Sequence, residues 1–144
     1  MNLINFSLVT PERTVMSQEL TSLTCPTTLG DITILPNHTQ LVANLIAGEL
    51  HAKSEKDSFY IHVTGGFVEV RPGNQVVVLA DSAEHFYEID AQRAEEAKLR
   101  AEKELAEKKA GSQEYAAVAA ALERSLTRIK VARKHAHRKN FGPK

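Results

Sequence analysis

The chain has 144 residues, of which 42% are hydrophobic and 25% charged, and its formal net charge is zero. This composition is normal for one globular domain or a small domain with an appendage. The apolar runs are far shorter than the roughly 18 residues of a membrane-spanning helix, and we expect no signal peptide, because no basic stretch precedes an apolar core at the N-terminus. The single cysteine, Cys25, excludes an internal disulfide framework and a multi-cysteine metal site.

The zero net charge conceals a marked asymmetry between the two ends of the chain. Residues 1–88 contain four Lys or Arg and ten Asp or Glu, whereas residues 89–144 contain fourteen and eight. All of the positive excess lies in residues 110–144, which have eight basic and two acidic residues. The two ends are therefore expected to meet different partners.

Residues 1–88 have the composition and alternation of strands and turns. In Phe59–Thr64 the apolar side chains alternate with polar ones, and Phe67–Arg71 and Gln75–Ala80 flank the turn Pro72-Gly73-Asn74, which predicts a hairpin. Shorter candidate strands are Leu3–Val9, Thr14–Met16, Leu20–Cys25, Ile32–Leu35, and Leu41–Ala52 with a break at Gly48. Seven or more short strands predict an antiparallel sandwich or flattened barrel. No helix of crossover length separates the strands, which argues against a parallel sheet.

From Asp90 onward the hydrophobic period is that of a helix. Asp90 is a good N-cap, and residues 91–109 are strong helix formers. Gly111 can end this helix and Ser112 can cap a second one, so the short link predicts an antiparallel helical hairpin. The apolar stripes are Ala94, Ala97, Ala101 and Leu105 in the first helix, and Tyr115, Val118, Leu122, Leu126 and Ile129 in the second. Because alanine buries little area, the first stripe predicts weak packing.

The sequence contains no recognisable catalytic constellation. Gly65-Gly66 is followed by Phe67 rather than by a lysine and a helix start, so it is no phosphate-binding loop. No serine or cysteine has a base at a motif spacing, and no histidine pair has the spacing of metal ligands. We therefore expect a protein that is not an enzyme and that holds no metal.

Four arginines form two pairs with helical spacing. Arg93 and Arg100 share one face of the first helix, and Arg124 and Arg128 share one face of the second. If the hairpin folds back on itself, the pairs can converge, and convergent guanidinium groups bind phosphates bidentately. The alternative is four solvated charges with glutamate neighbours such as Glu96 and Glu123, and spacing alone favours that alternative.

Several longer motifs carry a resemblance to a known family. Two segments resemble the ε subunit of F-type ATP synthase. The first is Gly30-Asp31-Ile32-Thr33-Ile34-Leu35-Pro36-Asn37-His38-Thr39-Gln40-Leu41. The second is Gly65-Gly66-Phe67-Val68-Glu69-Val70, followed by Asn74 and Val78-Leu79-Ala80-Asp81. Pro11-Glu12-Arg13 and the helical tail agree in place and length. The resemblance covers essentially the whole chain. Thr33, Asn37 and Gln40 depart from the family's usual glycine, glycine and proline.

The resemblance implies a fold and a non-catalytic role. The fold would be an antiparallel β-sandwich of about ten strands in residues 1–88, followed by a two-helix hairpin in residues 89–144. The sandwich would join the γ subunit and the c-ring in the central stalk of a proton-translocating enzyme, with the loop from Asp31 to His38 facing the c-ring. The chain would be peripheral, at the cytoplasmic face of a bacterial membrane.

The resemblance also implies a regulatory role for the hairpin. The helices could stay folded on the sandwich or extend along γ, and the extended form would inhibit ATP hydrolysis. Their basic end would then reach acidic loops of the catalytic β subunits, with the α subunits as further partners. The residues proposed for that contact are Lys130, Arg133, Lys134, Arg138 and Lys139.

Some members of the family bind ATP in the folded form, as a regulatory ligand rather than a required cofactor. The motif of that site matches Ile89-Asp90-Ala91-Gln92-Arg93-Ala94, the additional arginines match Arg100, Arg124 and Arg128, and Glu84 matches a further contact.

Two other classes of function compete with this interpretation. A basic-tailed adaptor could bind nucleic acid or an anionic membrane, but Phe141 is the only aromatic residue in the basic run and offers little base stacking. A stand-alone small-ligand sandwich would leave the helical tail without a role. We therefore expect no nucleic-acid partner.

Overall fold

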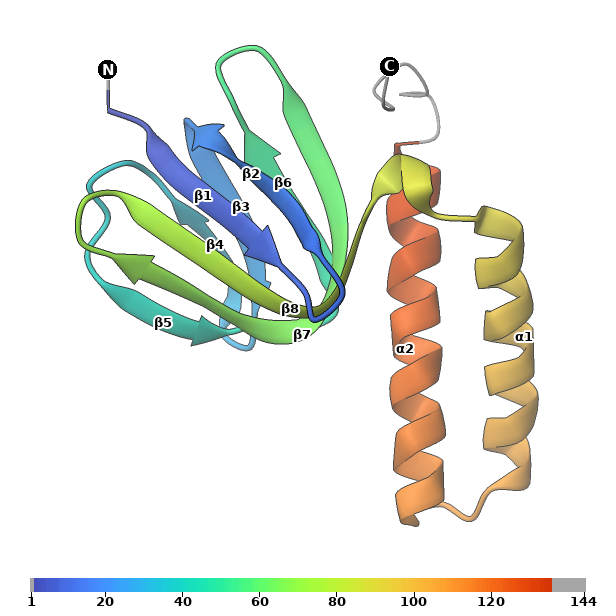
Figure 1. The fold of residues 1–144 in the computed structure, drawn as a ribbon. Helices are drawn as coiled ribbons and strands as arrows, with labels where there is room; N and C mark the ends of the chain where they lie inside the picture. The colour runs from blue at the N-terminus through green and yellow to red at the C-terminus, as the bar shows by residue number, and fades with distance from the viewer. Residues whose placement is uncertain (1, 136–144) are drawn as a thin grey trace. The chain divides into compact units, whose positions relative to one another are not determined.

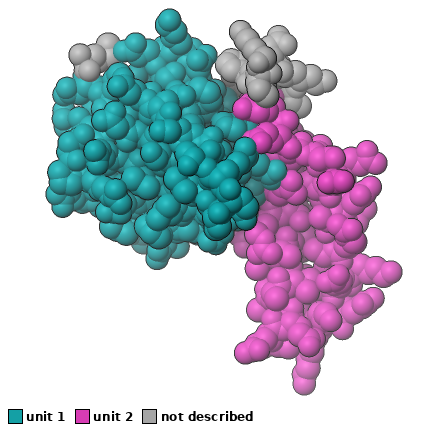
Figure 2. Space-filling view, viewed as in Figure 1, with its two compact units in different colours: residues 1–85 teal, residues 86–144 magenta. Residues whose placement is uncertain are grey.

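The computed structural model describes residues 2–135 of the chain. The chain forms two compact units, residues 1–85 and 86–144, which are coloured separately in Figure 2. The first unit contains all the strands and the second contains the helices (Figure 1). The division falls three residues before the boundary after residue 88 that the sequence predicts.

The first unit is a β-sandwich, as predicted. Its eight strands are β1 (Ile4–Val9), β2 (Thr14–Leu20), β3 (Ser22–Thr27), β4 (Gly30–Ile34), β5 (Leu41–Asn44), β6 (Gly48–Lys53), β7 (Ser58–Arg71) and β8 (Gln75–His85). The sheet order is β2-β1-β8-β7-β6-β3-β4, and β5 also pairs with β7. Alternate side chains point inward and form one core, with Phe6, Leu8, Leu23, Ile61 and Val68 almost completely buried.

The structure has eight strands rather than about ten because the two longest strands serve both layers of the sandwich. The two runs that we expected as separate strands, Phe59–Thr64 and Phe67–Arg71, are continuous in β7. The first half of β7 pairs with β6, and the second half pairs with β5. The chain changes layer at Gly65 and Gly66, which have φ angles of 57° and 108°.

One strand pair departs from the otherwise antiparallel pairing of the sandwich. β1 pairs with β8 in parallel, with Asn5 opposite Gln75 and Val9 opposite Leu79. A parallel pair needs a long connection between its strands, but that connection need not be a helix. Here the other six strands supply it.

The predicted β7–β8 hairpin is confirmed. Arg71 lies opposite Gln75, and both Gly73 and Asn74 in the turn have positive φ angles, of 78° and 60°. The turn also binds two other segments: the Asn74 carbonyl accepts a hydrogen bond from the backbone N–H of Asn5 (2.8 Å), and its side-chain Oδ1 accepts one from the backbone N–H of Asn37 (2.6 Å). Asn74 therefore joins the hairpin to β1 and to the β4–β5 loop.

We expect Gly66→Ala to destabilise the sandwich by about 2–4 kcal/mol, because a β-carbon would collide with the backbone of Leu79 and Ala80 on β8 while φ stays at 108°. Gly73→Ala is the matched control: its φ is 78°, but nothing lies within 4 Å of the added atom. The control should cost only about 1 kcal/mol. Urea unfolding of both variants measures the difference, and equal losses would show that the close approach to β8 is unimportant.

The second unit contains a short 3-10 turn, η1 (Phe86–Glu88), and two helices, α1 (Ala91–Glu107) and α2 (Gln113–Lys134). Both predicted N-caps are present: the Asp90 side chain accepts from the N–H of Arg93 (3.1 Å), and the Ser112 hydroxyl accepts from the N–H of Tyr115 (3.0 Å). Gly111, with a φ of 86°, lies in the link. None of the helices in the described part of the chain is long and apolar enough to span a bilayer.

The seam between the helices is built from small side chains. Ala94 and Ala101 of α1 are buried, as are Ser125 and Ile129 of α2. The predicted α2 stripe is partly wrong, because the side chain of Leu126 is 45% exposed. The helix turns about 100° per residue, so burying Ser125 and Ile129 against α1 rotates Leu126 outward.

Candidate functional site

The motif Ile89-Asp90-Ala91-Gln92-Arg93-Ala94 has a visible local role at the start of α1. Ile89 and Ala94 are buried, and Asp90 caps the helix through the hydrogen bond to the Arg93 backbone. The Arg93 guanidinium lies 3.8 Å from Asp90 Oδ2, and its side chain is 83% exposed. The motif therefore presents one arginine to solvent at a fixed place on the helix.

A groove of about 290 Å³ separates the middle parts of the two helices. Its lining residues are Ala97, Arg100, Ala101 and Glu104 from α1, and Ala117, Val118, Ala121 and Ser125 from α2. Of the predicted ATP-site residues, only Arg100 lines this groove. Arg124 and Arg128 lie on α2 immediately before Ser125 and three residues after it, and Glu84 lies on β8 in the other unit.

The basic end of α2 forms a second groove of about 520 Å³, which we call the lysine groove. It is lined by Lys98 of α1 and by Leu126, Ile129, Lys130, Arg133 and Lys134 of α2. Arg133 forms an ion pair with Glu95 of α1. The sequence analysis missed Lys98, although its position three residues after Glu95 puts it on the same side of α1. Arg138 and Lys139 lie outside the described residues.

Asp31 and His38 lie on β4 and in the following loop, and both are exposed. The His38 ring nitrogen Nδ1 lies 2.7 Å from the Thr39 carbonyl oxygen. Burial, together with the nearby Asp31 charge, raises the pKa of Cys25 to about 12, so the thiol stays protonated. The sequence did not indicate that two leucines near these residues are exposed. The side chain of Leu29 is 94% exposed and that of Leu35 is 56% exposed.

The outer face of the sandwich has an apolar region that the sequence analysis did not single out. Phe67 of β7 lies opposite Asn44 of β5 and Leu79 of β8, and Glu69 lies opposite Val42 and Val77. The side chains of Val42 and Leu79 are 67% and 39% exposed. We call Val42, Phe67, Val77 and Leu79 the apolar face. Exposed apolar side chains gathered on one face commonly mark a site of protein contact.

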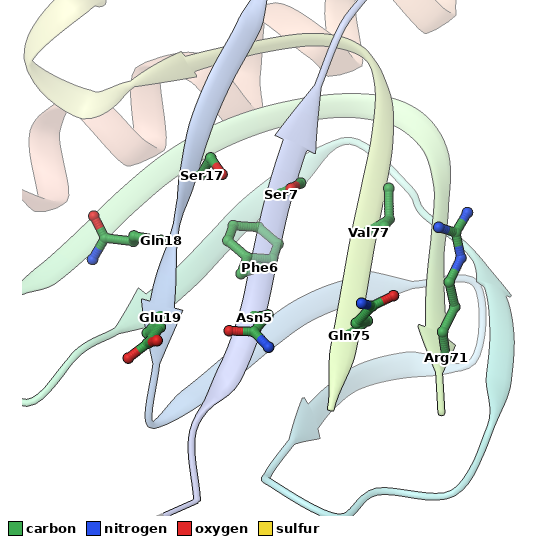
Figure 3. Close-up of a pocket in the computed structure, with 9 residues that line it drawn as sticks. All are labelled: Asn5, Phe6, Ser7, Ser17, Gln18, Glu19, Arg71, Gln75 and Val77. Carbon is green, nitrogen blue, oxygen red and sulfur yellow. The ribbon is translucent and has the colours of Figure 1, made fainter. Parts of the chain in front are cut away.

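A shallow polar hollow of about 360 Å³ adjoins the apolar face. Figure 3 shows its side chains in a row across neighbouring strands, with Glu19 on β2, Asn5 on β1, Gln75 on β8 and Arg71 on β7. Arg71 donates a hydrogen bond to Glu69 (3.2 Å), which lowers the pKa of that carboxyl. The apolar face therefore has a polar, hydrogen-bonding border.

Among residues 2–135, no group of three or more His, Cys, Asp or Glu side chains is arranged to hold a metal ion. A sandwich with an exposed apolar face and a hairpin with two charged grooves define the class of protein: a binding module with a helical appendage.

Comparison with known proteins identifies the family within this class. Residues 3–86 match the family model described as "ATP synthase, Delta/Epsilon chain, beta-sandwich domain", and residues 88–133 match "ATP synthase, Delta/Epsilon chain, long alpha-helix domain". The chain is 46% identical to an ATP synthase epsilon chain of Dehalococcoides mccartyi over 91% of its length and 93% of the relative. It is 39% identical to that of Herpetosiphon aurantiacus, over 90% and 94%.

Two solved assemblies contain chains with this fold. One is the Euglena gracilis mitochondrial ATP synthase, with a TM-score of 0.77, 19% identity and coverage of 95% of this chain and 82% of that one. The other is the central stalk and c-ring of the Tetrahymena thermophila enzyme, with a TM-score of 0.60, 14% identity, and coverage of 92% and 99%. The chain belongs to the ATP synthase delta/epsilon family, as a bacterial epsilon-type member, and is a non-catalytic subunit.

Proposed function

We propose that this chain is a rotor subunit of the central stalk, which couples the catalytic head of a proton-translocating ATP synthase to its c-ring. The observation that carries the proposal is the apolar face, because Val42 and Leu79 remain exposed on a sheet whose other side is fully packed. On this proposal the γ subunit covers the face, and the hydrogen-bonding groups of the polar hollow border the contact. The chain is then peripheral, at the cytoplasmic face of the bacterial membrane.

The c-ring contact is proposed for the loops beside β4. Asp31 and His38 supply polar and charged groups there, and Leu29 and Leu35 supply exposed apolar ones. An interface with an apolar centre and a polar rim needs both kinds of side chain.

The hairpin is proposed as the regulatory part, which inhibits ATP hydrolysis when α2 leaves α1 and reaches the catalytic β and α subunits. Ala94, Ala101 and Ser125 in the seam support this role, because small side chains bury little area and little free energy is lost at these positions when the helices separate. Lys130, Arg133 and Lys134 lie together at the end of α2, where they would meet acidic loops.

ATP is proposed to stabilise the folded hairpin, bound by Arg93, Arg100, Arg124 and Arg128, with Glu84, Ile89, Asp90 and Ala94 completing the site. Arg100 lines the groove between the helices, and Arg128 follows Ser125, which also lines it, by three residues. Residues three apart lie on the same side of a helix, which supports an approach of Arg128 to Arg100.

The fragment of residues 1–88 tests the division of labour. It contains all eight strands and the whole sandwich core, so we expect it to fold alone and bind γ. In that fragment, Leu79→Glu should weaken binding to γ at least about tenfold, because it replaces an exposed apolar side chain of the apolar face with a charge. Leu29→Glu is the control, since it places the same charge on a leucine in a turn off that face, where the side chain is 94% exposed against 39% for Leu79.

Calorimetry with purified γ gives both affinities, and thermal unfolding shows whether each fragment is folded. A folded fragment that does not bind γ, or equal binding by the two leucine variants, would contradict the proposed docking face.

A further inference from the structure

We propose that the lysine groove of the folded hairpin binds an anionic amphiphile, a molecule with a phosphate or carboxylate head and an alkyl tail. This function goes beyond the ATP site and the inhibitory contact proposed above. It rests on a groove to which both helices contribute and whose lining combines four basic side chains with two apolar ones.

The cationic part of the lining is assembled by the pairing of the two helices. Arg133 forms its ion pair with Glu95, which sets the turns of α2 and α1 side by side. Lys98 follows Glu95 by one turn, and Lys130 precedes Arg133 by one turn, so in an antiparallel hairpin these two lysines face the same stretch of groove. Lys134 extends the cluster toward the end of α2.

Two acidic residues of α1 contact members of this cluster. Glu95 is engaged by Arg133, and Glu102 lies 3.8 Å from the Lys98 ammonium, in a contact that leaves the lysine side chain 31% exposed. Four basic side chains line the groove, and no acidic side chain does. An anionic head would therefore meet an excess of positive charge.

The apolar part of the lining selects among anions. Ile129 is almost completely buried at the floor, and Leu126 is 45% exposed beside it. Leu122, one turn earlier on α2, is half-buried and continues the apolar line. A simple polyanion would gain nothing from these side chains, whereas an alkyl tail laid over them would remove apolar surface from water.

Such a ligand would also act on the hairpin. It contacts Lys98 of α1 together with Lys130 and Lys134 of α2, and this set of contacts exists only while the helices are paired. A ligand that binds one of two conformations shifts the equilibrium toward it. The amphiphile would bind the same basic side chains that are proposed to contact the catalytic subunits. Its binding residues would differ from those proposed for ATP.

The test is an amide NMR titration of the full chain with dodecyl phosphate and dodecanoate below their critical micelle concentrations. We expect saturable shifts at residues 126–134 and near Lys98. The octyl homologues should bind about tenfold to 200-fold more weakly, because their tails have four fewer methylenes to bury, at about 0.8 kcal/mol each when burial is complete. Lys130→Gln combined with Lys134→Gln should weaken binding about fivefold to thirtyfold. Lys103→Gln combined with Lys109→Gln removes the same charge outside the groove and should leave binding unchanged.

Three results would overturn the proposal. Inorganic tripolyphosphate binding as tightly as dodecyl phosphate would make the groove a plain anion site. Equal weakening by the two lysine pairs would mean that only net charge matters. Binding to phosphatidylglycerol vesicles without binding to dissolved amphiphile would assign the lysines to a membrane surface instead.

Discussion

Arg124→Ala and Arg128→Ala, separately, should each weaken ATP binding to the isolated chain by about 1.5–3 kcal/mol, which is roughly a tenfold to 150-fold rise in Kd. This range applies to hydrogen bonds that involve a charged group, and a triphosphate offers several to each guanidinium. Isothermal titration calorimetry measures the change directly. The double variant should lose measurable binding.

Two controls make this measurement specific. Arg124→Lys should restore only part of the affinity, because an ammonium lacks the planar fork of a guanidinium. Lys109→Ala removes a positive charge next to the link between the helices, away from the groove that Arg100 lines, and should have little effect. An unchanged Kd in the Arg124→Ala, Arg128→Ala double variant would return these arginines to the role of solvated charges.

Truncation of the chain after Leu122 should raise the ATP hydrolysis rate of the assembled complex severalfold. The deletion removes the buried end of the hairpin, Ile129 and Val131, together with all of the basic residues proposed to contact the catalytic subunits. Assembly should persist, because the sandwich is complete without the helices. Steady-state hydrolysis at low ATP is the measurement, since ATP would otherwise favour the folded hairpin.

Removing the charges of the basic tail without shortening it distinguishes the effect of charge on inhibition from the effect of deleting the segment. A variant in which glutamine replaces Arg133, Lys134, Arg138 and Lys139 should lose part of the inhibition of ATP hydrolysis. In the wild-type complex the inhibition should weaken as the salt concentration rises, because salt screens the charges and the Debye length is about 10 Å at 0.1 M. Lys103→Gln with Lys109→Gln again serves as the charge control, and its effect is compared per charge removed, because it removes two positive charges and the tail variant removes four. Wild-type rates in both the truncated and the neutralised complexes would show that the tail does not inhibit.

The local elements of the fold could be predicted from the sequence because their causes are local. The Pro72-Gly73-Asn74 turn, the Asp90 and Ser112 caps and the change to helical periodicity at residue 90 are each determined by neighbouring residues. The parallel pairing of β1 with β8 was not predictable in this way. It depends on six intervening strands, and nothing within Ile4–Val9 distinguishes a parallel neighbour from an antiparallel one.

The candidate binding surfaces also differ in whether they could be predicted from the sequence. The spacing of Arg93 and Arg100 is a property of one helix, and the motif at the start of α1 was recognisable from its residues. The lysine groove and the apolar face join residues that are far apart in the sequence, such as Lys98 with Lys130, and Val42 with Leu79. Their residues become neighbours only through strand register and helix pairing, and neither can be read from a single sequence.

The parallel pairing of β1 with β8 has a consequence for how the protein is made. The ribosome releases β1 first, yet the neighbour that covers its inner edge emerges about 70 residues later. Until then β1 has only the β2 hairpin, and Phe6 and Leu8 have no completed core to enter. Such high contact order slows folding and prolongs the exposure of apolar strands. Synthesis interrupted before β8 would therefore leave an aggregation-prone nascent chain, whereas interruption after β8 would release a finished sandwich.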